Sequence, residues 1–466
     1  MKKALFTVAA LAAATTLVAP KFIGDKVKDR FQDLVYSINQ LPYYQAQLIK
    51  TQSSWFGHKG TLQLTLDMAA MLADGAPANY APLVLDIDYT TQHGPIVSSG
   101  LALAQFQLSI RGDSIRDILV WPNETPFYRV DGKLDLTGAL SYEDHIPALT
   151  FQDGQDTMMI DPYSGKAWQA DDEIRYQAQL PLIRFDSENA RGEVNQIRID
   201  ASMPHNLFEH LQHMGWYDSD VRMAVDNISF NQADAESVLL KALSLNMLSR
   251  VDPDTRLADM NVSYKLQHLA VGEFEGNNME LSLEMNNLDE AAFVEINKLM
   301  ADQSASTQTD AYLATFNQNL KKHLLTLFQQ QPEFNISALK GSFPQGTVDA
   351  KLKSKLVDVT KIPEDLEDPA FWMTHIQADS QIQIAKELAR LVGQNQMRNQ
   401  FSQNPNFLAM DPAQQEQVLN QQVTNFFTML ETQGMLKSEG NDYLVDAKFA
   451  HGKGTINGQP MPFGQP

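Results

Sequence analysis

The chain has 466 residues, a formal net charge of −21 and no cysteine, which excludes a disulfide framework, a thiol nucleophile and a cysteine metal site. Hydrophobic residues make up 43% of the sequence and charged residues 20%, so we expect a packed core and not a disordered chain. Because residues 1–30 carry +4, the remaining residues carry −25. A surface of that charge argues against nucleic-acid binding and against peripheral docking on acidic lipid.

The first 20 residues are predicted to be an export signal or a membrane anchor. Lys2 and Lys3 precede an apolar run from Ala4 to Ala19, and Pro20 follows. The sixteen residues of this run fall just short of the roughly 17–25 of a spanning helix, so a cleaved signal peptide and a retained anchor both remain open. Pro20 favours the anchor, because signal cleavage at that point needs a permissive residue. The two lysines would stay in the cytoplasm, which predicts a body on the periplasmic side of a bacterial inner membrane.

Residues 21–42 are predicted to form an amphipathic helix that leads into the body. Its apolar residues recur at helical spacing: Phe22, Phe31, Leu34, Val35, Ile38 and Leu41. A helix that continues directly from the apolar run again favours a retained anchor.

An extended antiparallel β region is predicted for residues 43–288. Apolar and polar residues alternate there with a period of two, which indicates strands with one buried face. The alternating segments begin at Thr61, Leu83, Ala102, Lys133, Glu173, Asn195, Val221, Met260 and Asn278. Turns are expected at Asp131–Gly132, at residues 162–165 and at Gly276–Asn277. Such short connections cannot make parallel crossovers, so the sheet should be antiparallel.

A helical insertion is predicted for residues 289–332, with helices over residues 287–299 and 309–330. Residues 333–466 are predicted to be mixed strands and helices that complete the same sheet. Within them, Asp411 and Pro412 provide the cap and first-turn proline of a helix, and two short strands around His451 predict a C-terminal β-hairpin. The predicted fold class is therefore α+β: a large curved antiparallel sheet with helices as the natural cover of its apolar concave face.

His93 lies in a Gln-His-Gly-Pro corner where an alternating run stops. As a catalytic base it would need a nucleophile or a carboxylate partner, and Asp86 and Asp88 lie upstream on the same strand. As a structural residue it would bond a backbone carbonyl, while Gly94 supplies a positive φ and Pro95 fixes the direction in which the chain leaves. The structural interpretation is favoured.

A second group, His205, His210 and His213 with Glu209, falls in a short predicted helix and could hold zinc. The signal is weak because the HExxH spacing is absent. No GxSxG, GxxxxGK or GxGxxG motif occurs, and the C-terminal glycines up to Gly458 do not supply one. We therefore expect no cofactor.

Trp55 and Phe56 precede the first alternating segment. Aromatic side chains suit the boundary between a membrane and water, so this pair could be an interfacial anchor. Alternatively, the two rings pack against the end of the sheet and close it. The second, structural interpretation is favoured.

Four stretches of the chain occur together: the lysine-rich apolar leader, SSWFGHKGTLQLTL from Ser53, the corner QHGP, and the closing KFAHGKGTINGQPM from Lys448, which contains Gly458. In their order and spacing they resemble the YdgA-like family of bacterial envelope proteins, a domain of unknown function. The resemblance implies inner-membrane attachment, a periplasmic body, self-association and no established enzymatic activity, and it supplies no catalytic residues. The family usually has an acidic residue where this chain has Gln92, which weakens any scheme that needs a carboxylate beside His93.

Taken together, these patterns predict a non-enzymatic protein tethered to the inner membrane by its N-terminal segment. Its curved sheet would offer an apolar face to a lipid or an envelope protein, and strand addition at a sheet edge would make a homodimer. The alternative is an envelope hydrolase or metal-dependent enzyme centred on His93 or on His205, His210 and His213. A third hypothesis, a scaffold with no ligand, would lack an apolar groove.

Overall fold

The computed structural model divides the chain into two compact units, residues 1–237 with 297–308 and residues 238–296 with 309–466. The structure describes residues 35–36, 38–39, 44–67, 82–205, 216–233, 235–272, 274–305, 310–402 and 404–461. The leader expected over residues 1–20 and most of the helix expected over residues 21–42 lie outside the described residues. Within the part of the chain that the structure describes, no helix has the length and apolar character needed to cross a bilayer.

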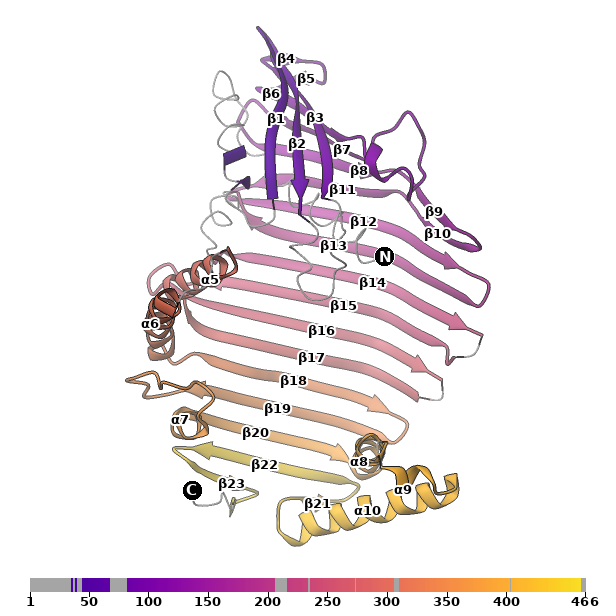
Figure 1. Ribbon diagram of the computed structural model, residues 1–466, viewed down its shortest axis with the longest axis vertical. Coiled ribbons are helices and arrows are strands. Elements are labelled where there is room, and N and C mark those ends of the chain that lie inside the picture. The colour runs from indigo at the N-terminus through magenta and orange to yellow at the C-terminus, as the bar shows by residue number, and fades with distance from the viewer. Residues whose placement is uncertain are drawn as a thin grey trace. The chain divides into compact units, whose positions relative to one another are not determined.

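The first unit is built on an antiparallel sheet (Figure 1). Its strands are β1 (Tyr44–Ser54), β2 (Gly57–Leu66), β3 (Leu83–His93), β4 (Ile96–Val97), β5 (Gly100–Leu101), β6 (Ala104–Ile110), β7 (Tyr128–Leu134), β8 (Leu140–Ile146), β9 (Leu149–Asp153), β10 (Asp156–Ile160), β11 (Tyr163–Ala170), β12 (Glu173–Asp186), β13 (Ala190–Pro204) and β14 (Ser219–Gln232). Neighbours pair in the order β1-β2-β3-β6-β7-β8-β11-β12-β13-β14. The β9–β10 hairpin joins β12 beyond the end of β11, and β4 and β5 form a separate small hairpin.

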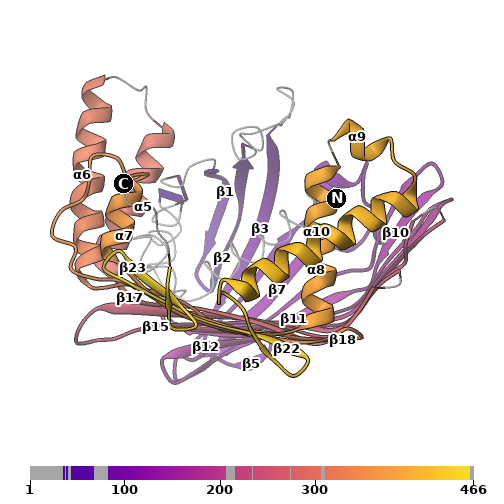
Figure 2. The ribbon, with the colours of Figure 1, turned by 90° about the horizontal axis from the view of Figure 1, so that it is seen from below.

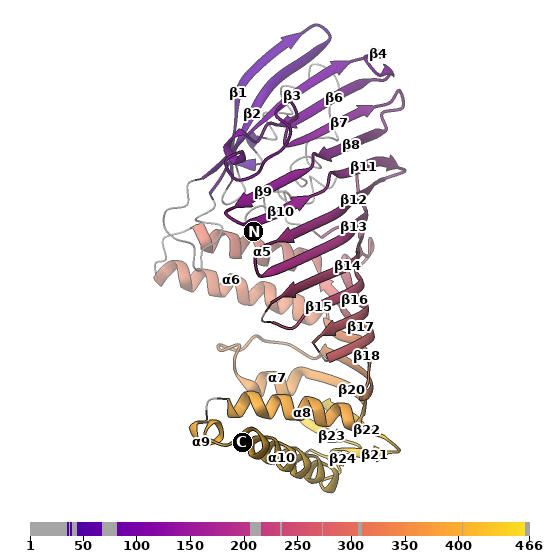
Figure 3. The ribbon, with the colours of Figure 1, turned by 90° about the vertical axis from the view of Figure 1, so that its right-hand side faces the viewer.

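The core of the first unit lies inside a curl of this sheet. Figure 3 shows β1, β2 and β3 folded over the strands that follow, so the buried rows of both groups meet in one apolar cluster. On β6 every second residue, from Ala104 to Ile110, points into that cluster and is buried. The described end of the predicted N-terminal helix joins it: Ile38 is buried there, and the Asn39 side-chain amide bonds the N–H and the carbonyl of Ala46 on β1, at 2.7 and 3.0 Å.

The second unit combines further antiparallel strands with helices. Its strands are β15 (Val238–Val251), β16 (Leu257–Val271), β17 (Phe274–Asp289), β18 (Glu333–Phe343), β19 (Gly346–Leu356), β20 (Ile376–Ala385), β21 (Lys437–Glu439), β22 (Asp442–Ala450), β23 (Lys453–Ile456) and β24 (Gln459–Pro460). The order is β15-β16-β17-β18-β19-β20-β22, and β21 and β23 pair with the other side of β22. The helices are α5 (Glu290–Ala305, which crosses the division between the units), α6 (Asp310–Gln329), α7 (Pro369–His375), α8 (Lys386–Phe401), α9 (Pro405–Leu408) and α10 (Pro412–Thr432).

The α+β class and the antiparallel sheet are confirmed. The helices expected over residues 287–299 and 309–330 are observed as α5 and α6. The expected cap is also present, because the Asp411 carboxylate accepts the backbone N–H of Gln414 at 2.9 Å and Pro412 begins α10.

The three expected turns are wrong, because their glycines lie inside strands. Asp131–Gly132 lies inside β7, residues 163–165 lie inside β11, and Gly276–Asn277 lies inside β17. A Cβ on Gly132 would lie 2.0 Å from Cζ of Phe106, and one on Gly276 would lie 2.9 Å from Cε1 of Phe343. Both glycines therefore leave room for an aromatic ring that lies flat on the neighbouring strand.

The strand expected from Lys133 is also wrong in its extent. β7 ends at Leu134 and β8 begins at Leu140, so the expected strand contains a turn. The Asp135 carboxylate holds this turn by accepting the N–H groups of Thr137 and Ala139, at 2.8 and 3.0 Å. Apolar residues on both sides of the turn continue the period of two, so the sequence pattern indicated one uninterrupted strand.

Substituting Gly132 by alanine tests the ring-over-glycine contact. We expect Gly132→Ala to lower the free energy of unfolding by about 1–3 kcal/mol, because the new methyl group overlaps the Phe106 ring. The measurement is the urea midpoint of the full chain. Phe106→Leu removes the overlapping ring atoms, so Gly132→Ala should cost clearly less in that background. Equal costs in both backgrounds would show that the ring is not the cause.

Candidate functional site

The sheet of the second unit has one face made almost entirely of apolar side chains. In an antiparallel pair, residues directly opposite each other point to the same face. The register of β15 to β22 therefore places the following residues on one face: Leu243, Leu245, Met247, Met260, Val262, Tyr264, Leu266, Met279, Leu281, Leu283, Met285, Phe334, Ile336, Leu339, Ala350, Leu352, Ile382, Ile384, Val445 and Phe449. We call this set the apolar face. It crosses seven strands and includes no charged residue.

The apolar face is only partly covered. Its members are half-buried for the most part, and Tyr264, Phe334 and Leu339 are 41–46% exposed. The inward rows of the first unit are different, because their side chains are buried in a closed cluster. Within the described residues, the sheet of the second unit therefore carries a core-like surface without the layer that would complete a core.

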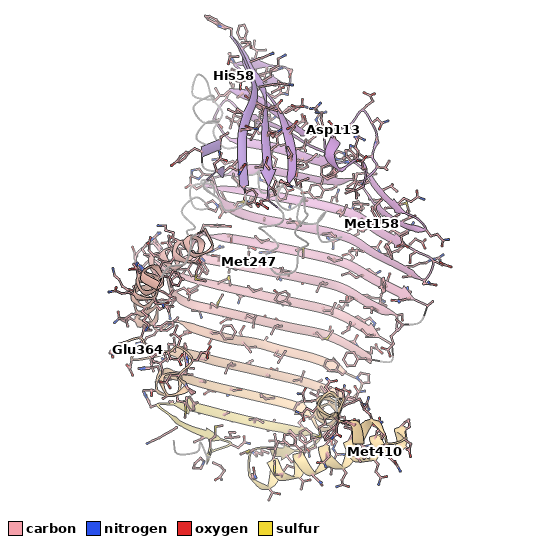
Figure 4. All side chains as sticks on the ribbon, in the orientation of Figure 1. His58, Asp113, Met158, Met247, Glu364 and Met410 are labelled. Atoms are coloured by element: carbon pink, nitrogen blue, oxygen red, sulfur yellow. The ribbon has the colours of Figure 1, made fainter. Side chains whose placement is uncertain are left out.

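Helices pack on the apolar side at the two ends of these strands. Figure 2 shows α6 and α7 at one end and α8 and α10 at the other, all on the same side of the sheet. At one end Leu356 of β19 packs against a cluster that includes Phe371 of α7 and Phe328 of α6. At the other end the ring of Phe427 on α10 stacks on Tyr443 of β22, with centroids 5.2 Å apart. The helices therefore border the apolar face, and Figure 4 labels Met247 on the sheet between the helices at its two ends, nearer to α5 and α6.

The opposite face of the same strands is polar. Cross-strand ion pairs lie there, including Lys265 with Glu280 at 3.4 Å and Lys340 with Asp349 at 3.5 Å. Two shallow hollows open on this side near β20 and β22, and their linings include Lys351, Lys448 and Asp446. Their charged walls suit water and ions, so an apolar ligand would bind on the other face.

The Gln-His-Gly-Pro corner is a structural junction. The backbone N–H of His93 donates to the carbonyl of Phe56 at 2.8 Å, and the half-buried His93 ring lies edge-on to His58 with centroids 5.1 Å apart. The positive φ expected at Gly94 is wrong. Gly94 is needed for close approach instead, because a Cβ there would lie 1.7 Å from the carbonyl oxygen of Ala102. The Gly94–Pro95 peptide bond is cis and turns the chain into β4.

The carboxylates considered as partners of His93 are bonded elsewhere. Asp88 accepts the hydroxyl of Thr61 at 2.7 Å, and Asp86 accepts the side-chain amide of Gln63 at 2.9 Å. Both bonds run to the neighbouring strand β2. They hold two strands together and do not place an acid beside the His93 ring.

Trp55 and Phe56 do not pack against the sheet as the favoured interpretation expected. They form the two-residue turn of the β1–β2 hairpin, and Trp55 is 92% exposed. The pairing of β1 with β2 moves both rings beyond the last backbone pair, Ser54 with Gly57, where the described strands leave them exposed.

The histidines expected to bind zinc are not assembled within the described residues. His205 Nδ1 lies 3.1 Å from the backbone carbonyl of Asp172, while His210, His213 and Glu209 lie outside the described part of the chain. Among described side chains, no group of three or more potential ligands could hold a metal ion. Gly458 is a turn residue: with Asn457 it has positive φ and joins β23 to β24.

A buried carboxylate in the first unit was missed by the sequence interpretation. Asp144 of β8 is only 3% exposed and accepts the hydroxyls of Tyr128 at 2.9 Å and Tyr176 at 3.1 Å. The Tyr176 hydroxyl also bonds that of Tyr163. Gly165 makes the space, because a Cβ there would lie 2.0 Å from the Asp144 carboxylate. A charged residue on the inward row of an alternating strand, between Tyr142 and Ile146, was the available signal.

Burial controls the protonation of this cluster. Desolvation raises the pKa of Asp144 above its usual value, and the hydrogen bonds from Tyr128 and Tyr176 oppose that rise. Desolvation also raises the pKa of Tyr176 and of Tyr163, and the negative charge of Asp144 adds to both increases. The tyrosines therefore remain hydrogen-bond donors to the carboxylate at neutral pH.

A family model described as "Bacterial protein of unknown function (DUF945)" matches residues 1–463. The match covers nearly the whole chain and confirms the family resemblance of the leader, the Gln-His-Gly-Pro corner and the closing motif. Comparison with curated proteins and with solved structures finds no match.

The raised pKa of Asp144 predicts a pH dependence of stability. Between the unfolded pKa, about 3.9, and the raised folded pKa, the folded chain binds the extra proton. The contribution of Asp144 is therefore fully present below about pH 4 and is lost as pH rises through the folded pKa. Asp144→Asn does not titrate, so urea midpoints from pH 4 to 8 should favour the variant increasingly over the wild type as pH rises.

Asp135→Asn is the matched control for that measurement. Hydrogen bonds from Thr137 and Ala139 lower the pKa of Asp135, so its contribution is present above the unfolded pKa and is lost as pH falls. The Asp135→Asn difference should therefore stay nearly constant from pH 4 to 8 and change only below about pH 4, whereas the Asp144→Asn difference changes within that range. A change of the same sign in both variants would contradict the assignment of Asp144.

Proposed function

The chain belongs to DUF945, a bacterial family of unknown function, and we propose that it is a non-enzymatic envelope protein that binds lipid acyl chains on the apolar face of its second unit. The N-terminal segment would tether it to the inner membrane, with the body in the periplasm. The observation that carries the proposal is the apolar face itself, which is broad, half-buried and free of charged residues.

The dimensions of the apolar face suit extended hydrocarbon chains. Seven strands at about 4.8 Å spacing span roughly 29 Å across the sheet, and alternate residues along each strand add a width of about 20 Å. Each buried methylene contributes about 0.8 kcal/mol, so a long chain gains affinity from length alone. Specific small-molecule sites instead contain a few convergent polar groups. The polar side chains that share this face, Tyr264, Ser249, Ser354 and Ser380, are scattered over four strands.

Methionines support an unspecific hydrocarbon ligand. Met247, Met260, Met279 and Met285 lie on four positions of the apolar face. The unbranched, polarizable methionine side chain adapts to irregular apolar partners. Such a surface can accommodate acyl chains of different length and unsaturation.

The hydrolase alternative has less support. It requires a carboxylate or a nucleophile that acts with His93, whereas Asp86 and Asp88 bond to β2 and the His93 backbone anchors the β1–β2 turn. Self-association by strand addition remains a second proposal. Among the described strands, the edge strand β24 has only two residues and includes Pro460, which disfavours pairing at that edge.

Two adjacent residues of β18 provide a test. Leu339 lies on the apolar face and Lys340 on the polar one, so Leu339→Glu and Lys340→Gln each change the net charge by one unit in the same direction. Both side chains are at least partly exposed, so neither change disturbs a core. Bringing a carboxylate into contact with hydrocarbon costs more than 1.4 kcal/mol, so Leu339→Glu should lower acyl-chain binding at least about tenfold while Lys340→Gln leaves it nearly unchanged.

The measurement is photo-crosslinking of the full chain in bacterial envelopes fed a diazirine-bearing fatty acid. Mass spectrometry should locate adducts on peptides of β15 to β20 in the wild type and in Lys340→Gln, and far fewer in Leu339→Glu. Adducts confined to residues 1–42, or equal on all three proteins, would refute acyl-chain binding on the sheet.

A further inference from the structure

One row of side chains crosses the apolar face at right angles to the strands, which Figure 1 shows side by side from β15 to β22. Directly opposed residues on successive strands form this row: Leu245, Tyr264, Leu281, Leu339, Ala350, Ile382 and Val445. We call these seven residues the central row. Six of them carry hydrocarbon side chains, so the polar group of the central row is the hydroxyl of Tyr264 at its second position.

The Tyr264 hydroxyl has no hydrogen-bond partner among the described residues, and Tyr264 is 43% exposed. Its neighbours on the same face are apolar in all four directions: Leu245 and Leu281 across the strands, and Val262 and Leu266 along β16. A hydrocarbon layer over the face would separate this hydroxyl from water. Because covering a hydroxyl without a new partner is unfavourable, a ligand that covers the central row must bring a polar atom to Tyr264.

The three serines that share the apolar face do not impose the same requirement. The Ser354 hydroxyl donates to a backbone carbonyl of β18. Ser249 is already buried, at 7% exposure, so a ligand would not desolvate it further. Ser380 lies outside the central row, on β20. A serine hydroxyl also lies close to the backbone and can bond it locally, whereas the hydroxyl of Tyr264 lies at the far end of a ring.

The absence of charged residues from the apolar face selects among polar ligand groups. An ionised carboxylate that leaves water needs a cation or several donors, and one hydroxyl among leucines provides neither. A neutral ester carbonyl is an acceptor that one phenolic O–H satisfies. The chemistry around Tyr264 therefore fits an esterified acyl chain and disfavours a free fatty acid.

The position of Tyr264 in the row sets the direction of the chain. On one side, the second unit continues for one strand spacing, about 4.8 Å, to Leu245 of β15. On the other side the central row continues for five spacings, roughly 24 Å, to Val445 of β22. Within the second unit, a long chain that begins at Tyr264 therefore has room in the direction of β22.

We propose that Tyr264 positions an esterified lipid on the apolar face. Its hydroxyl donates to the ester carbonyl of an acyl chain, and the chain lies along the central row towards β22. This inference rests on the proposed function, because it needs acyl chains on this face, and it adds the class of lipid, the polar contact and the orientation. Tyr264 is then a specificity-determining residue that distinguishes ester lipids from lipids without a carbonyl.

Photo-crosslinking with position-specific lipids tests the orientation. The full chain is reconstituted in vesicles that contain a phosphatidylethanolamine whose acyl chain carries a diazirine, either next to the ester or next to the terminal methyl group. We expect the ester-side probe to label peptides of β16 and β17, and the methyl-side probe to label peptides of β19 to β22, as located by mass spectrometry. A second pair of probes carries an ether linkage in place of the ester and so lacks the carbonyl acceptor.

Tyr264→Phe removes the hydroxyl and keeps the ring, so the apolar area of the face is retained. We expect this variant to lower the preference of the ester-side probe for β16 and β17 by about two- to tenfold, the effect of one hydrogen bond, while total labelling of β15 to β22 changes by less than about twofold. The ether probes should show the same low preference on the wild type and on Tyr264→Phe. Ser380→Ala, which removes another hydroxyl of the same face, is the matched control and should leave the preference of the ester-side probe unchanged.

The results separate this inference from the proposed function. Labelling of the same peptides by both ester probes, an unchanged preference in Tyr264→Phe, or an equal preference of the ether probes would refute the contact with Tyr264 and leave acyl-chain binding intact. An ester-side probe that labels β20, and that loses this position in Ser380→Ala, would assign the ester to Ser380 instead. If none of the probes labels β15 to β22, both the proposed function and this inference are wrong.

Discussion

Antiparallel pairing that keeps the rows of neighbouring strands aligned, across a few register shifts at bulges, is the constraint on which both units depend. With no cysteine in the chain, backbone hydrogen bonds and side-chain packing must hold the fold. Each directly opposed pair points to one face, so a strand with period two keeps its apolar row in line with the rows of its neighbours. In the first unit the aligned rows curl around a closed core, and in the second they leave the apolar face open between two groups of helices.

Glycines and buried polar groups occur where the alternation of inward apolar and outward polar side chains is interrupted. Gly132 and Gly276 lie within strands and give space to Phe106 and Phe343. Asp144 occupies an inward position that an apolar residue would fill elsewhere, and tyrosine hydroxyls compensate its burial. A buried carboxylate must find such partners, because an isolated one would be too costly to desolvate.

The sequence predicted strands correctly where apolar and polar residues alternate over a long, uninterrupted stretch. It was less reliable where one residue type, such as glycine, is compatible with two local structures. Strands such as β12 and β16 follow directly from their pattern, and so does the cap of α10 at Asp411. Gly132 resembled a turn because a glycine that admits a ring and a glycine that reverses the chain look the same locally. How much of the apolar face stays exposed depends on where α8 and α10 pack on the sheet. A local sequence pattern does not determine such a tertiary contact. Trp55 was expected to pack against the sheet because the pattern did not show that β1 precedes it and turns there.

The methionines of the apolar face have a chemical consequence. Met260 and Met285 oppose each other on β16 and β17, with Met247 and Met279 on the same face, and all four are half-buried. Oxidation of a thioether to the sulfoxide replaces apolar area by a strong dipole, and dedicated reductases reverse it. An oxidant that reaches the sheet would therefore make the apolar face wettable, whereas a hydrocarbon chain bound there, as proposed, would shield the sulfur atoms. Ligand occupancy and redox damage would then compete for the same four side chains.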